Sequence, residues 1–148
     1  MFQDLPLFTQ VARLHFSRAH TLLAEAGLHP SQYHLLTLLN ASQGLSQHEI
    51  AKQLLMKPST LTIMLRRLER DGMVEKKRDT EDKRVFRIYL SPSGEERLQE
   101  GNRKFAQLEE ELYRNFSPSD RDLLERLATL MRDNLLNSLS KEGPWCQS

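Results

Sequence analysis

The sequence predicts a mainly α-helical protein with a small β element (α+β), and three observations support this fold class. Apolar residues recur every three or four positions over long stretches at both ends of the chain, which is the spacing of helices with one buried face. The middle of the chain holds shorter segments of the same kind, separated by glycine and proline. A stretch with strand-like alternation follows them. With 148 residues, 39% hydrophobic and 28% charged, the chain fits one domain with a large surface.

The first predicted helix runs from Leu5 to Ala26. Asp4 and Pro6 favour its start, and Gly27 supplies the left-handed residue that often ends a helix. Its apolar residues share one face: Leu5, Phe8, Ala12, Phe16, Ala19, Leu22, Leu23 and Ala26.

Two shorter helices are predicted next. The second begins at Pro30 and ends before Gly44, and its inward residues should be Tyr33, Leu35, Leu36 and Leu39. The third opens at Ser46, because Ser46 and Glu49 can each satisfy a free backbone N–H of the other in a capping box. Its buried face should consist of Ile50, Ala51, Leu54 and Leu55.

A fourth helix is predicted from Pro58 to about Asp71, with Gly72 ending it. Its buried side should be Leu61, Met64, Leu65 and Leu68. The side facing away carries Ser59, Thr60, Thr62, Ile63, Arg66, Arg67 and Arg70. Small hydroxyl residues let a helix approach DNA closely, and the arginine fork suits guanine O6 and N7. Alternatively, the threonines are merely solvated and Arg66 and Arg70 pair with Glu69 or Asp71.

A two-stranded hairpin is predicted from residues 74–77 and 85–90, which enclose a charged tip. In the second strand Phe86, Ile88 and Leu90 alternate with Val85, Arg87 and Tyr89. The basic residues at or near the tip are Arg78, Lys83 and Arg84. Their charge suits the negative potential of a DNA minor groove, and Asp82 stands two residues before Arg84, where it could support that guanidinium.

Two further long helices complete the prediction. One starts at Ser91-Pro92 and reaches about Asn115, and the other is capped by residues 117–120. Their apolar residues lie on single stripes: Leu98, Phe105, Leu108 and Leu112 in the former, and Leu123, Leu124, Leu127, Leu130, Met131, Leu135 and Leu139 in the latter. Three long leucine-rich helices with little else to cover them favour a symmetric dimer.

The charge is unevenly distributed along the chain. The net charge is only +1, but residues 52–87 hold eleven Lys or Arg against six Asp or Glu. A basic segment that coincides with the order helix, helix, turn, helix, charged hairpin is typical of a DNA-binding helix-turn-helix. The charge alone would also fit a charged surface that is simply exposed to solvent.

The chain resembles the MarR family of bacterial regulators. The resemblance rests on residues 45–51, 58–62 and 68–74, on the wing-like run Arg78–Arg84 with its Asp-x-Arg signature, and on residues 90–94. The charged run is the most specific of these motifs. The match extends from the first helix to Leu139.

The resemblance implies a winged helix-turn-helix at residues 31–91, dimerisation helices at 1–30 and 92–140, and a polar tail at 141–148. It implies a homodimer on double-stranded DNA, with one recognition helix in each of two major grooves of a palindrome. Arg84 would then enter the minor groove, supported by Asp82. It also implies a repressor released by a small aromatic or anionic effector, in a crevice that His15, Phe16, His20 and Tyr33 could line.

The sequence departs from the family pattern at three places. Ser91 stands where threonine is frequent, which keeps the cap, and Lys57 stands where a capping side chain is usual. Oxidant sensing by an N-terminal cysteine is unsupported, because Cys146 is the only cysteine and cannot form an internal disulfide.

Other classes of function find little support in the sequence. The five histidines lack the spacing of a zinc motif, and there is no glycine-rich phosphate loop or nucleophile elbow, so we expect no enzyme, cofactor or metal. A helical module that binds only protein would not need hydroxyl and arginine side chains on one helix face beside a basic hairpin. The chain has neither a membrane-spanning stretch nor the pattern of a signal peptide, so we expect a cytoplasmic protein without a membrane partner.

Overall fold

The structure, a computed structural model, describes residues 1–141. The predicted polar tail, including Cys146, lies outside the described residues except for Lys141. The elements in chain order are η1 (Phe2–Asp4), α1 (Leu7–Glu25), α2 (Pro30–Ala41), β1 (Leu45–Ser46), α3 (Gln47–Gln53), α4 (Pro58–Arg70), β2 (Val74–Arg78), β3 (Phe86–Leu90), α5 (Pro92–Leu112) and α6 (Pro118–Lys141).

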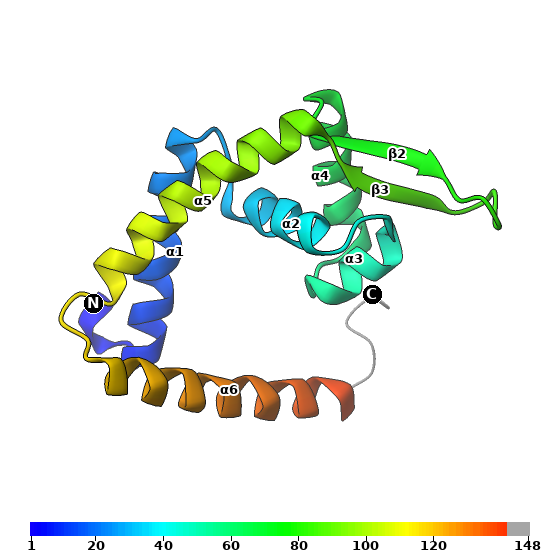
Figure 1. The fold of residues 1–148 in the computed structure, drawn as a ribbon. Coiled ribbons are helices and arrows are strands. Elements are labelled where there is room, and N and C mark those ends of the chain that lie inside the picture. Colours follow the sequence, from blue (N-terminus) through cyan, green and yellow to red (C-terminus); the bar gives the residue numbers. More distant parts are fainter. Residues whose placement is uncertain (142–148) are drawn as a thin grey trace.

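The predicted fold class is confirmed. Residues 1–141 form six α-helices and one small sheet at one end of the molecule, from which the β2–β3 hairpin projects as a wing (Figure 1). The long α5 begins at the base of this wing and runs past α2 to α1, so it joins the two halves of the molecule. Among residues 1–141, no helix combines the length and the apolar character needed to cross a membrane.

The sheet has three antiparallel strands in the order β1-β3-β2, so the prediction of only two strands was incomplete. Ile88 of β3 lies opposite Leu45 of β1 on one side and Lys76 of β2 on the other. The strand β1 is only Leu45–Ser46 and leads directly into α3. Two residues are too few to produce an alternating pattern, which is why the sequence did not indicate this strand.

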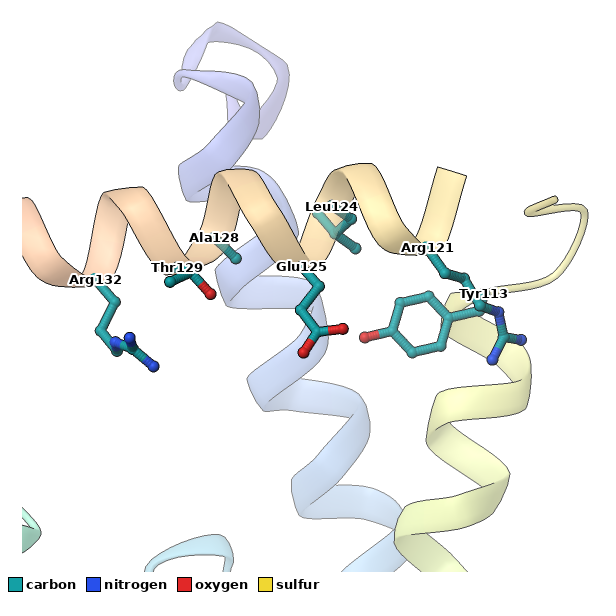
Figure 2. Close-up of a pocket in the computed structure, with 7 residues that line it drawn as sticks. All are labelled: Tyr113, Arg121, Leu124, Glu125, Ala128, Thr129 and Arg132. Atoms are coloured by element: carbon teal, nitrogen blue, oxygen red, sulfur yellow. The ribbon is translucent and has the colours of Figure 1, made fainter. Parts of the chain in front are cut away.

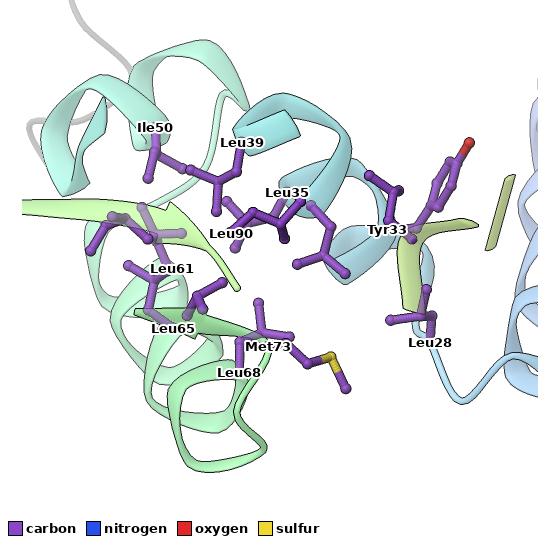
Figure 3. Packing of buried hydrophobic residues seen from close by; sticks show 14 of the residues in the cluster. Leu28, Tyr33, Leu35, Leu39, Ile50, Leu61, Leu65, Leu68, Met73 and Leu90 are labelled. Carbon is purple, nitrogen blue, oxygen red and sulfur yellow. The ribbon is translucent and has the colours of Figure 1, made fainter. Parts of the chain in front are cut away.

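The main core lies between α2, α3, α4 and the sheet. Leu35, Leu39 and Ile50 are fully buried, and they meet Leu61, Leu65 and Leu68 from one face of α4 (Figure 3). From the sheet, Ile88 packs into this core and is fully buried. The predicted inward faces of α2 and α4 are therefore confirmed, and Met64 is half-buried at the edge.

The predicted caps at Ser46 and Ser91 are also observed. Ser46 accepts the Glu49 N–H at 3.3 Å while the Glu49 carboxylate accepts the Ser46 N–H at 2.7 Å, which forms the capping box of α3. Ser91 accepts the Gly94 N–H at 3.0 Å and opens α5. The N-cap of α4 is Lys57, which makes no side-chain capping hydrogen bond, because a lysine side chain has no acceptor atom.

Leu55 was wrongly predicted to be buried. Because α3 ends at Gln53, Leu55 lies beyond the helix in the turn to α4, with φ of 49° and 48% of its surface exposed. Leu54 is only half-buried. The prediction continued α3 two residues beyond its end at Gln53.

The helix α1 packs along α5 through its second half. It begins at Leu7 rather than Leu5, after the short η1 turn. Ala19 and Leu22 are buried against Leu108 of α5, and the Arg18 guanidinium donates two hydrogen bonds of 2.7 Å to Glu111. Apolar side chains in the first half of α1 remain exposed: Leu7 74%, Phe8 65%, Val11 44%, Leu14 59% and Phe16 55%.

The last helix, α6, leaves most of its apolar side chains uncovered within the single chain. It follows a turn in which Asn115 has φ of 69°, so α5 ends at Leu112, three residues earlier than predicted. In Figure 1, α6 runs across the ends of α1 and α5 and away from them. Leu139 is half-buried, and the other large apolar residues are 40–63% exposed: Leu123, Leu124, Leu127, Leu130, Met131, Leu135 and Leu136.

Candidate nucleic-acid interface

The outer face of α4 carries four of the five predicted recognition-helix residues in exposed positions. Ser59, Thr60, Arg66 and Arg67 are exposed, whereas Leu61, Leu65 and Leu68 on the opposite side have no exposed surface. Pro58 as the first helical residue and Gly72 with φ of 71° after the end delimit this face. The helix therefore presents hydroxyl and guanidinium groups to solvent, while its opposite side is packed in the core.

Thr62 is the exception among the predicted residues. It is half-buried, its Oγ1 lies 2.9 Å from the Pro58 carbonyl oxygen, and it also contacts the Gln47 side chain by a hydrogen bond. Thr62 therefore links α4 to the start of α3.

The acidic side chains near Arg66 are engaged elsewhere. Asp71 accepts a 2.9 Å hydrogen bond from Arg70, and a Glu69 oxygen lies 3.7 Å from the Lys76 Nζ. The expected alternative of internal pairing thus applies to Arg70. Among the described residues, neither Arg66 nor Arg67 pairs with a carboxylate.

At the wing, the three predicted basic residues Arg78, Lys83 and Arg84 are all exposed. The Arg84 side chain is 94% exposed, and its Nε lies 3.4 Å from Asp82 Oδ1, which also accepts the Arg84 N–H at 3.0 Å. Arg78 has a different position, because it donates to the Lys83 carbonyl at 3.1 Å and its guanidinium lies 5.3 Å from the centre of the Phe86 ring. Arg78 therefore bridges the two ends of the loop at the wing tip. The Arg84 side chain extends into solvent, with Asp82 beside it.

The wing is tied to the helices by a network that sequence reasoning did not identify. Asp79 accepts the backbone N–H groups of Glu81 and Asp82 and a 2.6 Å hydrogen bond from Arg87. The Asp82 N–H, the Arg87 guanidinium and the Glu81 N–H lower the pKa of Asp79 from 3.8 to about 2. Arg87 also donates to Glu49 of α3 at 3.0 Å. Arg87 thus joins the tip end of the wing strands to the start of α3.

The four residues predicted to line a ligand crevice fall into two neighbouring aromatic groups. Phe16 and His20 of α1 both lie against His29, at centroid distances of 6.2 and 5.3 Å. His15 and Tyr33 both contact Phe105 of α5, Tyr33 by stacking at 5.0 Å. Tyr33 is buried and its hydroxyl donates to Asn102 at 3.0 Å, so Tyr33 contributes to packing.

Two other histidines beside these groups are biased toward the neutral form. Burial lowers the pKa of His29, and His20 lowers it further; burial and His15 likewise lower the pKa of His34. Within residues 1–141, no group of three or more His, Cys, Asp or Glu side chains is arranged to hold a metal ion.

Two cavities lie at junctions of helices. One, of about 410 Å³, lies between the start of α2 and α4, and its lining consists of His29, Ser31, Gln32, Thr60, Ile63, Met64 and Arg67. The other, of about 670 Å³, lies where α5 meets α6, between Tyr113 and the α6 side chains from Arg121 to Arg132 (Figure 2). The Arg121 guanidinium lies 4.9 Å from the centre of the Tyr113 ring. The first cavity matters more for the interface, because it reaches the outer face of α4.

A helix-turn-helix whose second helix and wing both expose basic side chains defines the class of winged-helix transcription regulators. Three comparisons narrow this class. The family model described as "MarR family" matches residues 28–86. The HTH-type transcriptional regulator YwoH of Bacillus subtilis is 34% identical over 118 residues, which cover 80% of this chain and 85% of YwoH. The chain belongs to the MarR family.

Solved structures of relatives have the same fold. The crystal structure of the S. aureus MepR–DNA complex superposes with a TM-score of 0.79 at 28% identity and covers 86% of this chain and 95% of MepR. The transcriptional repressor CouR, bound to a 23-mer DNA duplex, superposes with a TM-score of 0.77 at 28% identity, covering 84% of this chain and 89% of CouR. Both of these relatives were thus solved with DNA, and CouR is named as a transcriptional repressor.

Proposed function

We propose that this protein is a homodimeric, sequence-specific DNA-binding regulator that represses transcription at a palindromic operator and is released by a small ligand. The observation that carries the proposal is the outer face of α4, where Ser59, Thr60, Arg66 and Arg67 are exposed, and where neither arginine pairs with a carboxylate of residues 1–141. The similar MepR and CouR structures, both with DNA, support the same reading.

In this proposal α4 enters the major groove and the wing follows the adjacent minor groove. Arginine is suited to guanine edges in the first and to the negative potential of the second. Arg67 and Lys83 would add phosphate contacts. The Asp79–Arg87–Glu49 network would hold the wing at a constant distance from α3, so that both contacts form together.

The dimer is proposed from the apolar surface that one chain leaves uncovered. The first half of α1 and residues 123–136 of α6 expose large apolar residues, and contiguous apolar patches of this kind mark interaction sites. A second copy covers them by two-fold symmetry, and this symmetry matches that of a palindrome. We therefore assign residues 1–30 and 92–140 to dimerisation and residues 31–91 to DNA binding.

The ligand proposal rests on the cavity between α2 and α4. Its volume lies within the range typical of small-molecule sites, and Arg67 supplies a cation for an anionic ligand. Thr60 and Arg67 belong to both the cavity and the DNA-reading helix, so an occupied cavity would compete with DNA contacts. Phe16 and His20 lie beyond His29 at the edge of the same region.

A gel-shift assay with genomic fragments and excess competitor DNA tests DNA binding. The proposal expects one or a few fragments to be retarded at nanomolar protein concentration, with competitor present. Uniform binding of all fragments, or no binding at micromolar concentration, would contradict it.

The ligand step is tested on a retarded fragment with a panel of phenolic and carboxylate compounds. A coupling of the usual size would weaken DNA binding by about 5- to 150-fold. Ser31→Leu, which adds bulk to the α2 wall of the cavity, should abolish this response and leave DNA affinity unchanged. A response that survives Ser31→Leu would place the ligand elsewhere.

A further inference from the structure

Ile63 has an unusual position on α4. It is 54% exposed, while the three leucines on the other side of the helix have no exposed surface. At 100° per residue, Ile63 lies opposite Leu61, Leu65 and Leu68, near the middle of the outer face. Its neighbours one turn away are Ser59, Thr60, Arg66 and Arg67. An apolar side chain thus stands among the polar groups proposed to meet DNA.

Exposure alone would not assign a role to Ile63, because single exposed apolar residues are common. Its placement differs from that of the other exposed apolar residues of the described chain. Most of these belong to the continuous faces of α1 and α6. Ile63 belongs to neither face, and every other apolar residue that follows Pro58 in α4 is buried or half-buried.

The major groove offers one apolar group that could match such a side chain. Each base edge there presents hydrogen-bond donors or acceptors, and thymine alone adds a C5-methyl group. The β-branched Ile63 has a single strongly preferred χ1 rotamer in a helix, so little side-chain entropy is lost when it packs against that methyl group. Arginine and serine beside it would bind the neighbouring base edges or phosphates.

We propose that Ile63 is a specificity-determining residue that recognises a thymine C5-methyl group in each half-site. This inference rests on the proposed function, because it requires α4 to lie in the major groove. It goes beyond that function by assigning one base of the operator. Ile63 also lines the cavity between α2 and α4, so a role confined to ligand binding is the competing explanation.

The experiment uses a duplex selected by the protein from a random pool. Each thymine is replaced in turn by deoxyuridine, symmetrically in both half-sites, which removes only the methyl group and keeps the base pair. Dissociation constants are measured by fluorescence anisotropy for the wild type, Ile63→Ala and Ile63→Val. Thermal unfolding of the variants should match the wild type, since the side chain is exposed.

At one thymine position the wild type should lose about 4-fold in affinity per methyl group, and on the order of 15-fold for both half-sites together. Ile63→Ala should bind the unmodified duplex about as weakly as the wild type binds the uracil duplex, and it should be insensitive to that uracil. Ile63→Val keeps the branch at Cβ, loses only the terminal Cδ1 methyl group and should retain most of the discrimination.

The outcomes separate the inference from the proposed function. If the wild type prefers no duplex in the selection, the proposed function fails and the inference fails with it. If a duplex is selected but no uracil substitution weakens binding, or if the same substitution weakens wild type and Ile63→Ala equally, the inference alone is overturned. An Ile63→Ala variant that changes only the ligand response would overturn it in favour of the cavity role.

Discussion

Arg66 and Arg84 have different surroundings, and these predict different roles in DNA binding. Arg66 projects from the packed α4, where a fixed helix can aim it at a base edge. Arg84 projects from the wing tip with Asp82 beside it, 94% exposed, where charge and groove shape matter more than base identity.

We expect Arg66→Ala to cost roughly 1 to 3 kcal/mol on the selected duplex and much less on random duplex. Arg84→Ala should weaken both more evenly, and it should lower the salt slope of log K by roughly 2 for a dimer, at about 0.9 per phosphate contact. Titrations of both variants on both duplexes, over a range of salt concentrations, measure the loss of affinity and the salt slope. Identical behaviour of the two variants would mean that the reading face is misassigned.

Asp79 provides a test of the network at the tip end of the wing strands. Its pKa of about 2 is held down by the Asp82 N–H, then by Arg87 and the Glu81 N–H. Because the pKa is lowered by folding, the stabilisation is present above the unfolded value near 3.8 and is lost as the pH falls toward 2.

Arg87→Gln should therefore raise the pKa of Asp79 but leave it below 3.8, since the two backbone donors remain. NMR titration of the Asp79 carboxyl carbon measures the shift. An unchanged pKa would show that Arg87 does not hold this carboxylate in solution.

At the scale of single residues, the sequence predicted contacts between neighbours along the chain better than contacts between distant residues. Asp82 and Arg84 are two residues apart, so their spacing alone suggested the contact. Arg87 meets Glu49, 38 positions away, and only the folded sheet brings them together. Thr62 was predicted to face away, and its bond to Gln47 depends on the packing of α3 against α4, which spacing does not reveal.

At the scale of elements, the two caps of the helix-turn-helix differ in strength. Ser46 forms a reciprocal capping box, whereas Lys57 leaves the N-terminus of α4 without a side-chain acceptor. Both residues have extended backbone angles, so a serine at position 57 could cap α4 without rearrangement.

We expect Lys57→Ser to stabilise the protein by about 1 kcal/mol, and Ser46→Ala to destabilise it by a similar amount. Urea unfolding followed by circular dichroism compares the two with the wild type. Lys57→Ala is the matched control, because it removes the same charge without adding a cap. Equal stability of Lys57→Ser and Lys57→Ala would contradict the capping argument.

The helices were predictable because their signals are local. Capping residues, glycines with positive φ and leucine spacing located all six helices to within a few residues. The errors lie where a segment is short or where packing decides. The two-residue strand β1 shows no pattern of its own, and Leu55 continues a helical spacing that the chain abandons in the turn before Pro58.

At the scale of the whole molecule, the exposed leucines of α6 predict assembly. Leu130 is 52% exposed in the single chain, so a charge at this position would not disturb the chain's own core. In a dimer the same charge would be buried without a partner.

Leu130→Glu should therefore yield a folded monomer at micromolar concentration, while the wild type sediments as a dimer. Arg132→Glu, a glutamate introduced on the opposite side of the same helix, should remain dimeric. A wild type that sediments as a monomer would contradict the proposed assembly, and a dimeric Leu130→Glu would exclude this face of α6 as the interface.

The most direct test of the central proposal is selection of bound duplexes from a random pool by the full-length protein. The proposal predicts an inverted repeat whose half-sites lie about 10 base pairs apart, centre to centre, because two recognition helices related by two-fold symmetry enter successive major grooves. Recovery of a single unpaired half-site, or of no enriched sequence, would contradict a dimer that reads a palindrome through α4.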